Sequence, residues 1–134
     1  MRKKHIVVVL ALSIASVLTA ACGKKVGGSC KGTESTCLDK KTALACRGGT
    51  FAEVACAGPM GCSKYEDHAN CDTSVASAGD PCLGEDDEYA CSPDGKRAVA
   101  CKGGKFEPWL ECRGKAACTM LGHTVSCDTS IAEV

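Results

Sequence analysis

The chain has 134 residues, of which 13 are cysteine, and its 16 Lys and Arg residues balance 16 Asp and Glu residues. Electrostatic binding to nucleic acid needs clustered cations, and no segment is densely basic, so nucleic acid is excluded as a partner. Large apolar residues are few, which favours a small protein held by disulfides over one with an extensive core.

The first 21 residues have the features of a secretory signal peptide. Arg2, Lys3 and Lys4 form a cationic start, and the uncharged run at 6–18 has the length of a signal-peptide core. A transmembrane helix, the alternative, needs roughly 20 apolar residues. We expect cleavage of this leader, which leaves 13 Lys and Arg against 16 Asp and Glu, a formal charge of −3.

The segment Leu18-Thr19-Ala20-Ala21-Cys22 resembles the lipobox of bacterial lipoproteins. This resemblance implies a diacylglyceryl group on the Cys22 thiol, cleavage just before it, and acylation, typically with palmitate, of the new amino terminus. The residue after the cysteine is Gly23, and in the family that this segment resembles such a residue implies sorting to the outer membrane. An ordinary signal peptide is the alternative, but it would leave Cys22 as an odd cysteine in an exported protein. We expect attachment to the outer membrane through this lipid, on its periplasmic or its surface face.

The other twelve cysteines form two ladders with similar spacing. Successive cysteines are 7, 9, 10, 6 and 9 residues apart in the first ladder and 9, 10, 11, 6 and 9 apart in the second. This agreement predicts a duplicated module with three disulfides inside each copy, and the connectivity stays open. The first ladder contains Cys30, Cys37, Cys46, Cys56, Cys62 and Cys71, and the second contains Cys82, Cys91, Cys101, Cys112, Cys118 and Cys127.

The duplication predicts the domain organisation of the mature chain. After the cleaved signal peptide at 1–21 we expect a lipidated tether at 22–29, cysteine-rich module 1 at 30–76, a flexible linker at 77–81 and module 2 at 82–134.

Each module is predicted to be small, disulfide-rich and mainly β, with a three-stranded antiparallel meander. Gly48-Gly49 and Gly103-Gly104 mark hairpin turns between strand-like residues. Such a meander is too small to be stable without disulfides. One helical turn is expected in the second half of each module, near 62–67 and 115–121. The predicted strands lie at 36–39, 42–47 and 50–56 in module 1, and at 89–92, 96–102 and 105–111 in module 2.

The cysteine and histidine pattern favours neither metal binding nor catalysis. His68 and His123 precede a cysteine by three and four residues, but structural zinc sites use closer cysteine pairs than this chain contains. Cysteines in disulfides offer no thiolate nucleophile, and no nucleophile elbow is present. We expect that the protein is not an enzyme and that it binds no metal or cofactor. The alternative is a secreted redox or hydrolytic enzyme.

Two features occur only in module 2. The acidic run at 85–88 has the carboxylates that calcium prefers, but module 1 lacks it, so a solvated loop is favoured. Trp109 is the single tryptophan, and Phe106 and Tyr89 are expected near it. A cover for the thin core is the favoured interpretation of these aromatic residues. A ligand-binding site formed by Trp109, Phe106 and Tyr89 is the functional alternative.

The pattern Ala-x-Ala-Cys-x-Gly-Gly-x-Phe occurs at 43–51 and again at 98–106. It resembles small chitin-binding modules of extracellular proteins and duplicated cysteine-rich repeats of Gram-negative surface lipoproteins. The resemblance implies a glycan or an envelope protein as partner. We expect a membrane-anchored surface lipoprotein that acts as a non-enzymatic binding or envelope component. The alternative is a module that binds chitin-like or peptidoglycan-like carbohydrate.

Overall fold

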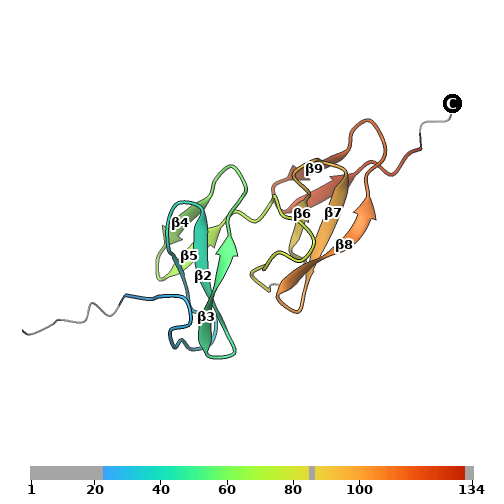
Figure 1. The fold of residues 1–134 in the computed structure, drawn as a ribbon. Helices are drawn as coiled ribbons and strands as arrows, with labels where there is room; N and C mark the ends of the chain where they lie inside the picture. The colour runs from blue at the N-terminus through green and yellow to red at the C-terminus, as the bar shows by residue number, and fades with distance from the viewer. Residues whose placement is uncertain (1–22, 85–86, 132–134) are drawn as a thin grey trace, which may run out of the picture.

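The computed structural model describes residues 23–84 and 87–131. Its ten strands form four small antiparallel sheets, two in each module (Figure 1). The predicted fold class, two disulfide-rich β modules that each contain a three-stranded meander, is confirmed. None of the described segments is a helix long and apolar enough to cross a membrane.

Module 1 consists of a meander followed by a hairpin. Strands β1 (Ser35–Cys37), β2 (Thr42–Arg47) and β3 (Thr50–Ala55) form the meander in the order β1-β2-β3, and β4 (Cys62–Tyr65) pairs with β5 (His68–Cys71). The predicted meander strands agree with the observed ones to within one or two residues at each end.

Module 2 repeats this arrangement. Its meander contains β6 (Tyr89–Cys91), β7 (Arg97–Lys102) and β8 (Lys105–Glu111), and its hairpin contains β9 (Cys118–Leu121) and β10 (Thr124–Cys127).

The helical turns predicted near 62–67 and 115–121 are wrong. Residues 62–67 form the first strand and the turn of one hairpin, and residues 118–121 are strand β9 of the other. Cys62 lies opposite Cys71 at the open end of one hairpin, and Cys118 lies opposite Cys127 in the other. Each of these cysteines forms a disulfide to the meander or to the segment that follows it. Two covalent links at one end hold both arms of a hairpin side by side, and they outweigh any local preference for a helical turn.

The disulfide connectivity is the same in both modules. The first cysteine pairs with the third, the second with the fifth and the fourth with the sixth. The pairs are Cys30–Cys46, Cys37–Cys62 and Cys56–Cys71 in module 1, and Cys82–Cys101, Cys91–Cys118 and Cys112–Cys127 in module 2.

Each meander buries side chains on both of its faces, as the alternation of side chains along a strand allows. In module 1, Leu44 and Phe51 pack with Cys30 on one face, and Ala43 and Val54 pack on the other. Module 2 has the same division, with Val99 and Phe106 in one cluster and Ala98 in the other. The disulfide sulfurs thus complete cores that contain few large side chains.

The two modules exchange contacts across the linker. Ala76, at the end of module 1, is buried in the core cluster of module 2, and Leu83 of module 2 packs against the core cluster of module 1. The linker at 77–81, which was expected to be flexible, is bound to module 2, because the Gly79 N–H donates to the Phe106 carbonyl at 2.8 Å. The guanidinium of Arg47 also lies against the backbone of module 2, beside Gly84.

Candidate binding surface on module 2

Strand β8 contains one residue more than its counterpart in module 1. Strands β2 and β3 pair without interruption. In module 2, Val99 pairs with Pro108 and Ala98 pairs with Leu110, so Trp109 between them has no partner on β7. This β-bulge explains why Cys101 and Cys112 are 11 residues apart when the matching cysteines of module 1 are 10 apart.

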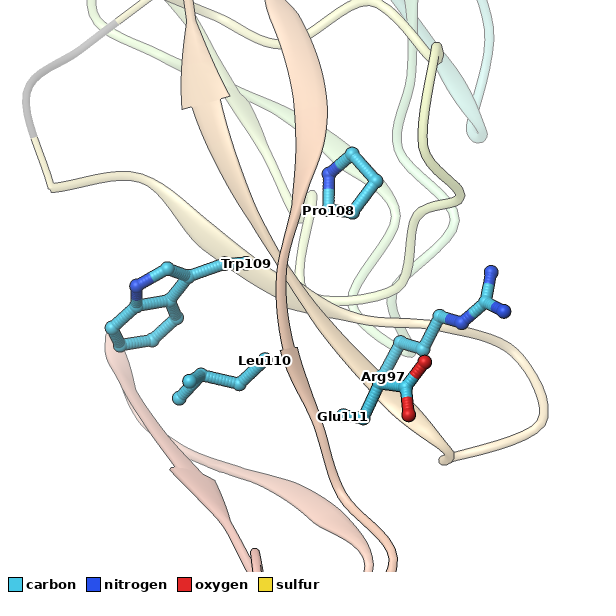
Figure 2. Close-up of a pocket in the computed structure, with 5 residues that line it drawn as sticks. All are labelled: Arg97, Pro108, Trp109, Leu110 and Glu111. Atoms are coloured by element: carbon cyan, nitrogen blue, oxygen red, sulfur yellow. The ribbon is translucent and has the colours of Figure 1, made fainter.

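The bulge changes which side chains reach the surface, because an extra residue bends the strand and redirects its side chains. Trp109 is 47% exposed and Leu110 is 36% exposed, whereas Val54, the register counterpart of Leu110 in module 1, is fully buried. Figure 2 shows Trp109 and Leu110, two consecutive residues, on the same side of β8. Pro108 fits this edge strand because it has no N–H to pair.

Tyr89 supports one face of the indole ring. The centroids of the Tyr89 and Trp109 rings are 4.8 Å apart, and the ring planes are tilted by 36°. Such offset aromatic pairs contribute about 0.5–1.5 kcal/mol beyond the area that they bury. Tyr89 itself is half-buried and starts β6, next to the disulfide-held centre of the meander. The indole is therefore held by Tyr89 on one side while about half of Trp109 remains exposed.

An open pocket of about 300 Å³ lies along β8, which forms the edge of its sheet (Figure 2). Arg97 and Glu111 line this pocket from the side of the strand opposite to Trp109. Glu111 accepts a hydrogen bond from Nε of Arg113 at 2.7 Å. The arrangement offers a flat aromatic surface with ionic groups across the strand, which suits stacking and hydrogen bonding.

The three residues predicted for this site separate in the structure. Trp109 and Tyr89 are in contact, as the sequence suggested. Phe106 is 2% exposed and packs with Val99 and Cys82 in the core, so its assignment as a ligand contact is corrected. Its counterpart Phe51 is buried in the same way, and this match between the modules is the sequence signal of a core residue.

The two histidines that precede a cysteine closely in the sequence, His68 and His123, belong to different hairpins. His68 contacts the edge of the Tyr65 ring, with 5.8 Å between the ring centroids, and His123 lies in the exposed turn between β9 and β10. Within the described ranges, one group of three possible metal ligands has its ligand atoms close together: Cys82, Glu88 and Cys101. The two sulfurs are joined in a disulfide, so this group offers no thiolate.

Glu88 has a structural role that the sequence did not reveal. Its carboxylate accepts hydrogen bonds from the Thr73 hydroxyl at 2.8 Å, the Leu83 N–H at 3.1 Å and the Gly84 N–H at 3.1 Å. One of the four acids at 85–88 therefore joins the end of module 1 to module 2. Residues 85 and 86 of this run lie outside the described residues.

No protein-family model matches this chain, and comparisons with curated proteins and with solved structures find no significant similarity. The signal peptide at 1–21 and the predicted lipidation site Cys22 lie outside the described residues.

Proposed function

We propose that the protein is a lipid-anchored envelope component of a bacterium and that it binds a ligand without catalysis through the exposed face of Trp109. Two observations support a location in the bacterial envelope. The segment Leu18–Cys22 resembles a lipobox, and all twelve later cysteines are in disulfides, which persist in oxidising compartments outside the cytosol. Because those cysteines are oxidised, they supply no catalytic thiolate.

The observation that carries the binding role is the bulge at Trp109. The meanders of the two modules share register and disulfides, and their β-strands differ in length by one inserted residue, which is the only tryptophan of the chain. Bulges often redirect a side chain at a functional site. An exposed tryptophan on a scaffold fixed by three disulfides loses little conformational freedom on binding, which favours its use as an anchor.

Carbohydrate is the ligand class that this surface favours. Tyr89 supports the indole from one side, and Trp109 is 47% exposed, so indole surface is available for stacking on the apolar face of a sugar ring. The polar groups of Arg97 and Glu111 lie across the same edge strand, within the pocket. An apolar side chain of an envelope protein is the competing occupant.

Binding can be tested with the single tryptophan as the reporter. Titration with soluble chitin and peptidoglycan fragments should change the Trp109 fluorescence, and pull-down on the insoluble polymers should retain the protein. Trp109→Ala should weaken retention by about tenfold or more, while Tyr65→Ala, which removes an exposed aromatic residue of module 1, should not. Deletion of Trp109 restores the spacing of module 1 and should abolish binding with the disulfides intact. Equal retention of wild type and Trp109→Ala would refute the site.

The anchor is tested separately. Mass spectrometry of the mature protein should find Cys22 as the first residue, with a diacylglyceryl group on sulfur and an acylated amino terminus. Cys22→Ala should move the protein from the membrane to the soluble fraction, because a lipid anchor of at least two chains is what gives stable attachment. An unmodified Cys22, or a mature chain that starts elsewhere, would contradict this part of the proposal.

A further inference from the structure

The end of module 1 adds a short strand to the meander of module 2. Val75 forms a parallel bridge with Cys91 on the free edge of β6. The Cys91 N–H donates to the Ser74 carbonyl at 2.9 Å, and the Ala76 N–H donates to the Cys91 carbonyl at 3.0 Å. Together with the hydrogen bond from Thr73 to Glu88, these contacts define how the tail of one module docks on the next.

The corresponding edge of module 1 has the same groups. Cys37 occupies the place of Cys91, since it pairs with Ala43 as Cys91 pairs with Ala98. Among the described residues, no backbone group pairs with Cys37 on its side away from β2. Glu34 occupies the place of Glu88, because the carbonyls of both residues accept a hydrogen bond at 2.8 Å from the third cysteine of their module. Module 1 thus has an edge without a described backbone partner beside Cys37, and Glu34 next to it. Lys24 of the same chain lies beside this edge, since its ammonium is 3.7 Å from the Glu34 carboxylate and 5.6 Å from the centroid of the Phe51 ring.

The segment after module 2 has the same sequence and local geometry as the tail that docks. The two segments have nearly the same sequence, since Asp72-Thr73-Ser74-Val75 corresponds to Asp128-Thr129-Ser130-Ile131. In both segments the aspartate accepts a hydrogen bond from the serine N–H two residues later, at 3.1 Å and 3.0 Å. Ile131 is 74% exposed, although its counterpart Val75 is partly buried against module 2. Module 2 therefore presents a preformed tail.

The residue types of a second contact between the modules also recur at matching positions. Arg47 lies against Gly84 and Gly104 of module 2. Lys102 holds the position of Arg47 in module 2, and Gly32 and Gly49 hold the positions of the two glycines in module 1. Nothing lies within 4 Å of the place that a Cβ would occupy on Gly32 or Gly49.

We propose that the tail Thr129–Ile131 of one copy docks on the open β1 edge of module 1 of a second copy, repeating the contact between the two modules within the chain. The predicted contacts are a hydrogen bond from Thr129 to Glu34, backbone pairing beside Cys37, and Lys102 against Gly32 and Gly49. Addition of a strand to an exposed edge is a common mode of recognition. Because the tail and the edge are different surfaces, the association is head-to-tail and can propagate along a row.

Two features of module 1 set the strength of this association. Lys24 forms an ion pair with Glu34 at 3.7 Å, and both side chains are 42% exposed. Lys24 has in module 1 the place that Ala76 has in module 2, because Gly27 and Gly79 donate to the carbonyls of Phe51 and Phe106 at 2.8 Å. Docking therefore requires Lys24 to leave Glu34 and the Phe51 ring. A surface ion pair of this kind contributes little to stability. Lys31 stands where module 2 has the apolar Leu83, which makes the contact between copies weaker than the one within the chain. Copies confined to one membrane surface would meet at a higher effective concentration.

The test is photo-crosslinking of the full chain in the membranes of the expressing cell. A benzophenone amino acid replaces Ile131 in one sample and the equally exposed Leu121 of β9 in a control sample. The Ile131 sample should give an adduct between two copies that peptide mapping places at residues 32–37, and the Leu121 sample should not. No adduct between copies, an adduct at another segment of the chain, or an adduct to a different protein would overturn the proposal.

Variants of the two contact residues separate docking from chance encounter. Thr129→Val and Glu34→Gln should each lower the yield of the Ile131 adduct by about tenfold, the value of a hydrogen bond to a charged group. Thr119→Val, which changes an exposed threonine on β9, is the matched control and should leave the yield unchanged. The three variants should keep all six disulfides by peptide mapping. The proposal would also be overturned if neither Thr129→Val nor Glu34→Gln lowered the yield of the adduct.

Discussion

Single aspartates organise the second half of each module. Asp72 accepts hydrogen bonds from the Met60 N–H at 2.9 Å and the Ser74 N–H at 3.1 Å, so it joins the segment before β4 to the tail after β5. Gly58 is required beside it, because a Cβ on Gly58 would overlap the carboxylate. Gly114 and Asp128 repeat this pair in module 2, which shows that the glycine and the aspartate form one structural unit.

The hydrogen bonds to Asp72 predict a specific dependence of stability on pH. Burial raises the pKa of Asp72, but the hydrogen bonds from the Ser74 side chain and from the N–H groups of Met60 and Ser74 outweigh it and hold the pKa below the ordinary value of 3.8. A carboxylate whose pKa is lower in the folded state stabilises the fold above its unfolded-state pKa. This contribution is lost as the pH falls through the lowered folded-state pKa.

Asp72→Asn should therefore lower the thermal unfolding temperature at pH 7, and the difference from wild type should narrow as the pH falls below about 4. The measurement is a series of thermal melts between about pH 2 and pH 7, within the range over which carboxylates titrate. Asp67→Asn is the control, because Asp67 lies in the exposed turn between β4 and β5 and its carboxylate accepts no hydrogen bond from another described residue. A difference that stays constant over the whole pH range would show that the charge of Asp72 has no part in stability.

At the scale of elements, the strands of the two meanders could be predicted and the hairpins could not. The Gly-Gly turns at 48–49 and 103–104 fix the centre of each meander, because all four glycines have positive φ. The hairpin β4–β5 gives no such signal. Its turn contains Glu66 with a φ of 49°, a conformation that few non-glycine residues adopt. The disulfides at its base impose this hairpin, and their connectivity could not be derived from spacing.

The candidate site was predicted in part for a related reason. The gap between Cys101 and Cys112 is one residue longer than its counterpart in module 1, but only the register of β7 and β8 shows that Trp109 is the extra residue of the strand. Contact between Tyr89 and Trp109 followed from their places on the outer strands of a narrow sheet. The link between Thr73 and Glu88 could not be foreseen, because it joins residues of different modules.

On the scale of the whole molecule, the contacts between the modules make them interdependent. Ala76 of module 1 lies in a cluster with Val99 and Phe106 of module 2, while Leu83 of module 2 covers the core of module 1. No disulfide joins the modules, because every pair lies within one module. The packing of Ala76 and Leu83 across the boundary therefore couples the two modules as a shared core would. Unfolding of one module exposes apolar surface of the other.

This arrangement predicts that the oxidised protein unfolds in one transition. Ala76→Asp places a charge in the core of module 2, which should destabilise the fold by about 3 kcal/mol and separate the melting of module 2 from that of module 1 in calorimetry. Ala78→Asp, two residues later on the exposed surface, adds the same charge and should leave a single transition near the wild-type temperature. If wild type itself melts in two steps, or if both variants behave alike, the modules are independent units and the contacts of Ala76 and Leu83 do not couple them.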